Sequence, residues 1–200
     1  MANTEQFERM AARYDDAERM NTAQLAAEAI RKMLGDTNSQ KAMDFGCGTG
    51  LVGLELVNEF KEMVFVDTSA NMLEQVQLKI TAGNIQNASV MQLDLESEQV
   101  QSIKFDCIMM TQVLLHIPSY QEVLSKLYDM LSAKGQLIIV DYNQNPLVTN
   151  DKIHPGFEQE HLKGVLETIG FQSVESKTFH HGIGLLAGQD ASLFCMSAVK

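Results

Sequence analysis

The chain has 200 residues, of which 45% are hydrophobic and 20% charged, and its formal net charge is −11. This length and composition predict one globular domain. No apolar run approaches the roughly 18 residues that a transmembrane helix needs. The 26 acidic against 15 basic residues disfavour nucleic acid and anionic membranes as partners, because the chain as a whole would repel their phosphates.

The cysteines and the N-terminal residues indicate the compartment. Cys47, Cys107 and Cys195 are widely spaced and lie in apolar stretches, a pattern that predicts reduced thiols rather than a disulfide framework. The N-terminal sequence MANTEQFERMAARYDD is too charged for a signal peptide, so we expect a cytoplasmic protein. The spacing of histidines and cysteines matches no metal-binding motif, and no metal is expected.

Apolar spacing along the chain alternates between helical and strand-like periods, which predicts an α/β sheet with crossover helices. Residues 7–14 have helical spacing, and a second helix follows with Asn21 as its predicted N-cap and Gly35 as its stop. We expect residues 1–35 to form a helical cap on a catalytic core of residues 36–200, all in one domain. Strands are predicted at about 41–45, 63–66, 89–93, 105–110 and 136–141, and helices near 51–60, 70–80, 120–131 and 158–169.

Local signals define the ends of several elements. Ser119 and Glu122 form a capping-box pattern for the helix near 120–131, and Gly135 and Gly170 are predicted to end two helices. Beyond Gly170, residues 171–179 and 192–199 are strand-like, and the glycine-rich connection between them is too short for a crossover helix. These last two strands should therefore be antiparallel.

The first predicted strand leads directly into the turn Asp44-Phe45-Gly46-Cys47-Gly48-Thr49-Gly50. Two registers compete for it. The dinucleotide fingerprint G-x-G-x-x-G fits Gly48, Gly50 and Gly53, whereas an acid-led pattern D-x-G-x-G-x-G begins at Asp44. A glycine fingerprint alone is weak evidence, so charge has to decide between the two registers.

A dinucleotide places its pyrophosphate against backbone amides at the start of the helix, where the Asp44 carboxylate would repel it. S-adenosylmethionine carries no phosphate and has an ammonium and a sulfonium group, so the same carboxylate favours it. Asp67 ends the second strand and is expected to bind the ribose hydroxyls, a role that NAD sites share. Asp94 closes the third strand, where it can accept from an adenine amine or cap the next turn. No lysine or arginine is close in sequence to hold a phosphate.

Through these motifs the chain resembles the class I S-adenosylmethionine-dependent methyltransferases, and specifically their small-molecule branch, which modifies quinones and other metabolites. The resemblance covers residues 1–200. Where nucleic-acid amine methyltransferases have sequences like N-P-P-Y, this chain has Thr111-Gln112-Val113-Leu114. The matching motifs are 44–50, Asp67 with Ser69, Met72 and Leu73, Asp94-Leu95, Phe105-Asp106 leading to Leu115-His116, 135–141 and 155–157.

The resemblance implies an α/β fold with a single Rossmann-like, doubly wound, seven-stranded sheet of order 3-2-1-4-5-7-6, its last strand antiparallel, and N-terminal lid helices. It implies methyl transfer from S-adenosylmethionine to a small molecule. His116 is the candidate catalytic residue, and Phe7, Tyr142, His180 and His181 are expected in the substrate pocket. The expected cofactor contacts are Tyr14, Asp44, Gly46, Cys47, Gly48, Gly50, Asp67, Thr68, Met72, Asp94, Leu95, Thr111 and Gln112.

Several alternatives stay open at this point. The alternative functions are a regulatory protein that binds S-adenosylmethionine without turnover and, less in keeping with Asp44, an NAD-dependent oxidoreductase. His116 is either a general base or a structural residue near a helix start. The N-terminal helix is either a mobile lid or a fixed cover of the sheet. The acceptor molecule, the acceptor atom and the oligomeric state do not follow from the sequence.

Overall fold

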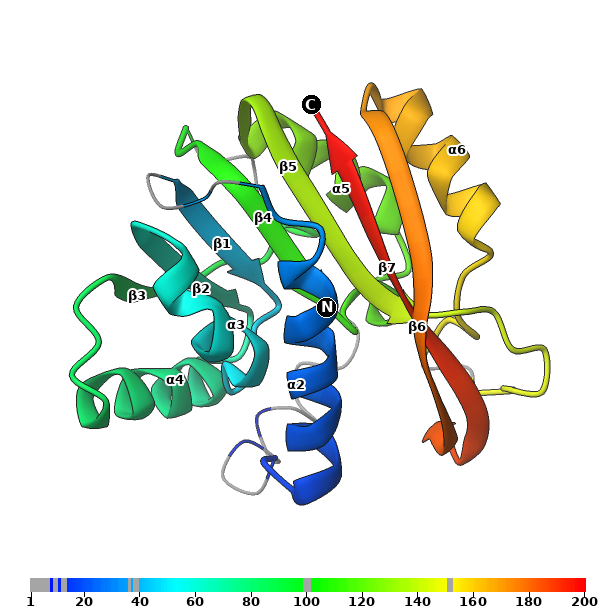
Figure 1. Cartoon of the computed structure of the whole chain (residues 1–200), viewed down its shortest axis with the longest axis horizontal. Helices are drawn as coiled ribbons and strands as arrows, with labels where there is room; N and C mark the ends of the chain where they lie inside the picture. Colours follow the sequence, from blue (N-terminus) through cyan, green and yellow to red (C-terminus); the bar gives the residue numbers. More distant parts are fainter. Residues whose placement is uncertain are drawn as a thin grey trace.

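The computed structural model describes residues 8, 11, 14–35, 37, 40–98, 102–150 and 153–200. Within these residues the strands form one seven-stranded sheet of order β3-β2-β1-β4-β5-β7-β6 (Figure 1). Strand β7 is antiparallel to both β5 and β6, and the other pairings are parallel. The predicted order and the antiparallel last strand are confirmed. The strands are β1 Lys41–Phe45, β2 Glu62–Asp67, β3 Ala88–Gln92, β4 Phe105–Thr111, β5 Leu131–Tyr142, β6 Gln172–Leu186 and β7 Gln189–Val199.

Helices cover both faces of the sheet. Buried side chains of α2, α3 and α4 form one hydrophobic cluster, and those of α5 and α6 belong to the cluster on the other face. Figure 1 shows α2 in front of the strands and α5 behind them. In the described part of the chain, no helix has the length and apolarity to cross a membrane. The helices are α2 Ala17–Arg31, α3 Leu51–Leu56, α4 Ala70–Ala82, α5 Tyr120–Met130 and α6 Gln159–Ile169, with short 3-10 turns η2 Val57–Glu59 and η3 Leu114–His116.

Strand register brings the candidate acids to one edge of the sheet. Phe45 pairs with Val66 in β2, and Asp44 pairs with Met109 in β4. Because these strands are parallel, their carboxyl ends lie at the same edge. Strand β1 lies between β2 and β4, so this edge contains the point where the strand order reverses. In open α/β sheets, ligands bind in the crevice at this point.

Helix α2 begins and ends earlier than its sequence signals predict. Its N-cap is Asp16, whose carboxylate accepts from the Arg19 amide at 2.8 Å, and Asn21 lies inside the helix. The helix ends at Arg31, ahead of Gly35. Both boundary predictions were wrong, because Asp16 offers an earlier cap of equal quality and tertiary packing sets where the helix stops.

The other boundary signals gave mixed results. Ser119 occupies the predicted N-cap position of α5 but makes no side-chain capping bond, and its hydroxyl contacts Glu96 instead, so the predicted capping box does not form. Gly170 ends α6 with a φ of 123°, as predicted. The prediction for Gly135 was wrong: α5 ends at Met130, and Gly135 lies within β5, where the pairing with β4 shifts register.

The hairpin of β6 and β7 is longer than the sequence predicted. The two strands extend into the expected glycine-rich connection and leave a two-residue turn, Ala187-Gly188. Both turn residues have positive φ, 51° and 79°, which is typical of the type I′ turn that suits tight hairpins. The hairpin therefore projects beyond the body of the sheet (Figure 1).

Gly53 in α3 allows the closest contact between this helix and the sheet. A Cβ atom built at Gly53 would lie less than 3.0 Å from both Asp44 Oδ2 and an atom of the Phe65 ring. In contrast, a Cβ at Gly164 in α6 would meet nothing within 4 Å. The two helical glycines therefore offer a matched pair for substitution.

We expect Gly53→Ala to lower the free energy of unfolding by about 1–3 kcal/mol, because the added methyl group overpacks the contact with β1 and β2. Gly164→Ala should raise it by about 0.4–1 kcal/mol, because alanine restricts the unfolded chain and fits the helix. Urea unfolding of the two variants measures both effects. Equal stability of the two alanine variants would show that α3 does not depend on this close approach.

Candidate functional site

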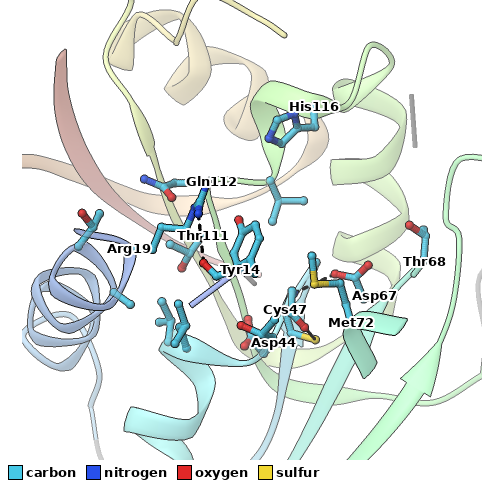
Figure 2. Close-up of a pocket in the computed structure, with 18 residues that line it drawn as sticks. Tyr14, Arg19, Asp44, Cys47, Asp67, Thr68, Met72, Thr111, Gln112 and His116 are labelled. Atoms are coloured by element: carbon cyan, nitrogen blue, oxygen red, sulfur yellow. Dashed lines mark hydrogen bonds between the residues drawn. The ribbon is translucent and has the colours of Figure 1, made fainter. Parts of the chain in front are cut away.

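A cavity of about 100 Å³ lies at the carboxyl ends of β1, β2 and β4 (Figure 2). Most of the residues that the sequence singled out line it. It is also lined by residues of α2 and α3 that the sequence did not indicate. The predicted lining residues are Tyr14, Asp44, Gly46, Cys47, Gly48, Asp67, Thr68, Met72, Thr111, Gln112 and His116, and the additional ones are Arg19, Thr22, Ala23, Thr49, Leu51, Val52 and Val113.

The glycine turn forms the floor of this cavity because its backbone adopts left-handed conformations. The φ angles of Gly46, Gly48 and Gly50 are 68°, 54° and 79°, values that residues with a Cβ rarely adopt. A Cβ at Gly46 would also lie less than 3.0 Å from the Val113 side chain. The turn therefore requires glycine for its conformation and, at Gly46, for close packing as well.

Asp44 is a buried carboxylate with an unsatisfied oxygen. Its side chain is 3% exposed, and Oδ2 has no hydrogen-bond partner among the described residues. The pKa of Asp44 is raised to about 7, mainly by burial and in part by the nearby Asp67 charge, against the lowering effect of the Gly53 amide. An isolated buried charge is costly, so this oxygen is suited to a ligand that brings a cation or a hydrogen-bond donor.

Thr111 presents a second unsatisfied polar atom to the same cavity. Its buried hydroxyl oxygen has no partner in the described chain. Asp44 pairs with Met109 in the parallel register, and Thr111 follows two residues later, so Asp44 and Thr111 lie on the same face of the sheet. Buried polar atoms are normally hydrogen-bonded, and two orphans on one cavity wall indicate a polar ligand.

Asp67 connects the end of β2 to the glycine turn. Its Oδ2 accepts from the Gly48 amide at 2.9 Å, and its Oδ1 accepts from the Ser69 amide at 2.9 Å. Burial raises the pKa of Asp67, although these backbone amides lower it. Each carboxylate oxygen can accept more than one hydrogen bond, so Asp67 can hold the turn and still bind a ligand hydroxyl.

Cys47 and Met72 contribute packing to the wall. Met72 is 1% exposed. Burial raises the pKa of the Cys47 thiol well above its ordinary value, and the Asp44 and Asp67 charges raise it further. The thiol therefore stays protonated at neutral pH and is a poor nucleophile, so Cys47 contributes packing to this wall and not a reactive group.

A second cavity of about 460 Å³ adjoins the first and shares Tyr14, Arg19, Gln112 and His116 with it. Tyr142 lines only this second cavity. Its hydroxyl accepts from Gln112 Nε2 at 2.8 Å and donates to the Leu185 carbonyl at 3.1 Å. Gln112 has a φ of 55°, a strained conformation for a residue with a side chain, of the kind that is concentrated at functional sites. It is also lined by Asp16 and α2, by Leu115 of η3, by residues 150 and 153, and by 185–187 at the hairpin tip.

His116 ends η3 and lines both cavities. Figure 2 shows it on the far side of the first cavity from Asp44. Burial lowers the pKa of His116 to about 4, so the imidazole is neutral at pH 7. It is available to accept a proton, but it is a weaker base than an exposed histidine.

Asp141 supports the segment that carries His116. It is fully buried, and its carboxylate accepts from the Leu115 amide at 3.3 Å and the Tyr142 amide at 2.8 Å. Burial raises the pKa of Asp141 to about 7. The sequence placed Asp141 at a strand end but gave no signal that it would hold η3, because Asp141 and Leu115 are 26 residues apart in the chain.

Some predicted residues lie away from both cavities. The Asp94 carboxylate accepts from the Glu96 amide at 3.0 Å and organises the turn after β3, and Leu95 is 1% exposed in the core. His180 and His181 lie in β6, paired with Leu193 and Ser192, and neither lines these two cavities. Phe7 lies outside the described residues. A role of Asp94 toward adenine stays a prediction.

Arg19 is the charged residue of the site that the sequence missed. Its guanidinium pairs with Asp16 at 2.5 Å, donates to the Tyr14 carbonyl at 3.1 Å and lies 4.6 Å from the centroid of the Tyr14 ring. The expectation that no arginine is near the glycine turn holds in sequence but not in space. Since Asp16 already neutralises Arg19, the electrostatic argument against a bound pyrophosphate is retained.

The chain is similar to known methyltransferases. Residues 43–137 match the family model described as methyltransferase domain. An uncharacterised methyltransferase of Schizosaccharomyces pombe is 29% identical over 120 residues, which cover 56% of this chain and 42% of that protein. The ubiquinone/menaquinone biosynthesis C-methyltransferase UbiE of Haemophilus ducreyi is 23% identical over 185 residues, covering 74% of this chain and 71% of UbiE. The chain thus spans less than half of the yeast protein.

A solved structure shows the same fold. Phosphoethanolamine N-methyltransferase 2 of Haemonchus contortus, in complex with S-adenosyl-L-methionine, has a TM-score of 0.73 at 15% identity and covers 88% of this chain and 52% of its own. The strand order and the glycine turn define a Rossmann-like α/β protein with a cofactor crevice at the strand ends. The methyltransferase-domain match and these similarities support a class I S-adenosylmethionine-dependent methyltransferase, as the motifs predicted.

The raised pKa of Asp44 predicts a pH dependence of stability. The ordinary pKa is 3.8 and the folded value is about 7, so the folded chain binds a proton that the unfolded chain has lost between these values. The free energy of unfolding therefore falls as pH rises from about 4 to about 7. The contribution of Asp44 is at most about 4 kcal/mol.

We expect Asp44→Asn to reduce this slope in urea unfolding of the ligand-free chain at pH 5, 6, 7 and 8. Asp141 contributes a slope of the same sign and His116, whose pKa is lowered to about 4, one of opposite sign, and both contributions are shared by the wild type and the variant. Glu74→Gln, on the exposed face of α4, is the control and should leave the slope unchanged. The same slope in the wild type and in Asp44→Asn would mean that Asp44 is ionised in the folded chain well below pH 7.

Proposed function

We propose that the chain transfers the methyl group of S-adenosylmethionine to a small-molecule acceptor and releases S-adenosylhomocysteine. The observation that carries this proposal is the pair of unsatisfied polar atoms, Asp44 Oδ2 and Thr111 Oγ1, on one wall of the cavity beside the glycine turn. The ammonium group of the cofactor supplies both the positive charge and the hydrogen-bond donors that these atoms lack.

The remaining contacts follow from the positions of the lining residues. Asp67 accepts hydrogen bonds from the ribose hydroxyls through the lone pairs left free by the Gly48 and Ser69 amides. Thr68 and Met72 border the region beyond the ribose, where the adenine would lie. Tyr14 borders the cavity next to the glycine turn, since a Cβ atom built at Gly48 would lie 3.9 Å from the Tyr14 ring.

The second cavity holds the acceptor in this proposal. Bound S-adenosylmethionine supplies an electrophilic methyl group, and the chain contributes by aligning the acceptor with it. Gln112 and Tyr142, linked at 2.8 Å, offer a hydrogen-bonding edge at the junction of the two cavities. Alignment of this kind accounts for much of the rate of a group transfer. Apolar side chains line the rest of the compartment: Leu115, Ile153, Leu185 and Leu186.

The charge of the protein supports a small molecule as the acceptor. A net charge of −11 opposes the approach of nucleic acid, whose binding depends on phosphate contacts with lysine and arginine. The free thiols of Cys47, Cys107 and Cys195 are consistent with a reducing compartment such as the cytoplasm.

Ligand binding tests the proposal directly. We expect S-adenosylmethionine and S-adenosylhomocysteine to raise the melting temperature in proportion to the logarithm of their concentration, because they bind only the folded chain. NADH should not. Asp44→Asn should weaken S-adenosylmethionine binding about tenfold or more, through loss of the charge-assisted contact with the ammonium group. Stabilisation by NADH alone would identify a dinucleotide enzyme, and cofactor binding without methyl transfer to any acceptor would favour a regulatory protein.

His116 offers a test of the chemical step. We expect His116→Gln to keep the affinity for S-adenosylhomocysteine within a few-fold and to lower the turnover number by about 10², at the low end of general-base effects because the pKa is only about 4. The acidic limb of the pH–rate profile should lie near this pKa and vanish in the variant. Turnover within a few-fold of the wild type would limit His116 to a structural role, and lost cofactor binding would place it in the cofactor wall.

A further inference from the structure

The segment Tyr14–Asp16 contacts the glycine turn and α4 through a pair of charged residues outside the binding cavity, Asp15 and Lys79. We propose that Asp15 and Lys79 are positioning residues that hold Tyr14 over bound cofactor and thereby set the rate of cofactor release. This inference rests on the proposed function, because it concerns the cover of the same site.

Asp15 bridges three elements of the chain. Its Oδ1 accepts from the Thr49 hydroxyl at 2.5 Å, and its Oδ2 pairs with Lys79 Nζ at 2.6 Å. Lys79, in the last turn of α4, also donates to the Thr49 carbonyl at 2.7 Å. The three residues form a closed set of contacts that joins the start of the described N-terminal segment to the glycine turn and to α4. We refer to Asp15, Thr49 and Lys79 as the clasp.

The clasp fixes the position of the neighbouring Tyr14. Figure 2 shows Tyr14 within the cavity, with Arg19 on one side and Cys47 and Met72 on the other. Arg19 holds the same residue from α2, through the Tyr14 carbonyl and the face of its ring. Tyr14 is thus secured on one side by the clasp and on the other by the helix behind it.

With this cover closed, the first cavity measures about 100 Å³, whereas small-molecule sites usually measure about 300–1,000 Å³. A ligand the size of S-adenosylmethionine therefore requires the cover to move. Helix α2 is a poor candidate for that movement, because Ala26, Ala27 and Ile30 are fully buried against the sheet. Residues 14–16, which the clasp and Arg19 hold through polar contacts, are the part that can open at low cost.

The clasp differs from the ion pair of Lys41 and Glu62. Lys41 and Glu62 lie at neighbouring strand starts, 34% and 46% exposed, and bring together elements already joined by the sheet. Asp15 instead contacts the hydroxyl of Thr49, a residue 1% exposed, and links segments that no sheet or helix hydrogen bond connects. A charge-assisted bond to a buried group is stronger than an exposed ion pair, so its loss should be measurable.

The test compares Asp15→Asn, Lys79→Met, the double variant and the conservative Lys79→Arg. Two quantities are measured: hydrogen exchange of the backbone amides of residues 14–16 without ligand, and the dissociation rate of S-adenosylhomocysteine. We expect both to rise roughly three- to tenfold in each single variant, as for loss of one partly buried charged contact. The double variant should be no faster than the single ones, and Lys79→Arg should be close to the wild type. Lys41→Met is the matched ion-pair control and should change neither rate.

Faster exchange with an unchanged dissociation rate would overturn the proposal, since the clasp would then hold the segment without controlling release. Unchanged exchange in Asp15→Asn, or effects that add in the double variant, would also overturn it. If the wild-type chain bound no S-adenosylhomocysteine, the proposed function would fail, while the exchange measurement without ligand would still report whether the clasp holds residues 14–16.

Discussion

A carboxylate buried at the end of β1 without a counter-ion is the constraint around which this site is organised. Asp44 is 3% exposed, its Oδ2 has no partner among the described residues, and its pKa rises to about 7. A fold that retained such a group for stability alone would gain by replacing it with an apolar residue, since unpaired buried charge is costly. The cost becomes intelligible if a cationic ligand completes the pair.

Contacts of the neighbouring elements fix the position of this carboxylate at the cavity. Gly53 lets α3 approach Asp44 closely, and Gly46 lets the following turn bend beneath Val113. Asp67 then holds the turn through the Gly48 amide at 2.9 Å. A change at any of these positions would move the carboxylate and the floor of the cavity together. The site is therefore a property of packing among β1, β2 and α3 and not of the glycine motif by itself.

The second cavity depends on another buried acid. Asp141 binds backbone amides of Leu115 and Tyr142 and so fixes η3, which carries His116, relative to the strand end that carries Tyr142. Tyr142 in turn connects Gln112 to the hairpin of β6 and β7. The second cavity thus combines the end of β5 with a projecting hairpin. Hairpin tips and loops tolerate sequence change better than the sheet beneath them, so the lining of the second cavity can vary while the glycine turn stays fixed.

The sequence by itself determined the class of fold, the strand order implied by the family resemblance, the antiparallel final hairpin and most residues from Asp44 to Thr111 that line the first cavity. These features depend on local patterns, namely apolar periodicity, glycine spacing and acids at strand ends, each of which is encoded within a few residues. Tertiary structure decided the rest. Arg19 and the clasp reach the glycine turn from elements tens of residues away, and His181 is directed to another surface by the length of the hairpin. Such contacts depend on where packed elements come to lie in space, and no short stretch of sequence specifies that.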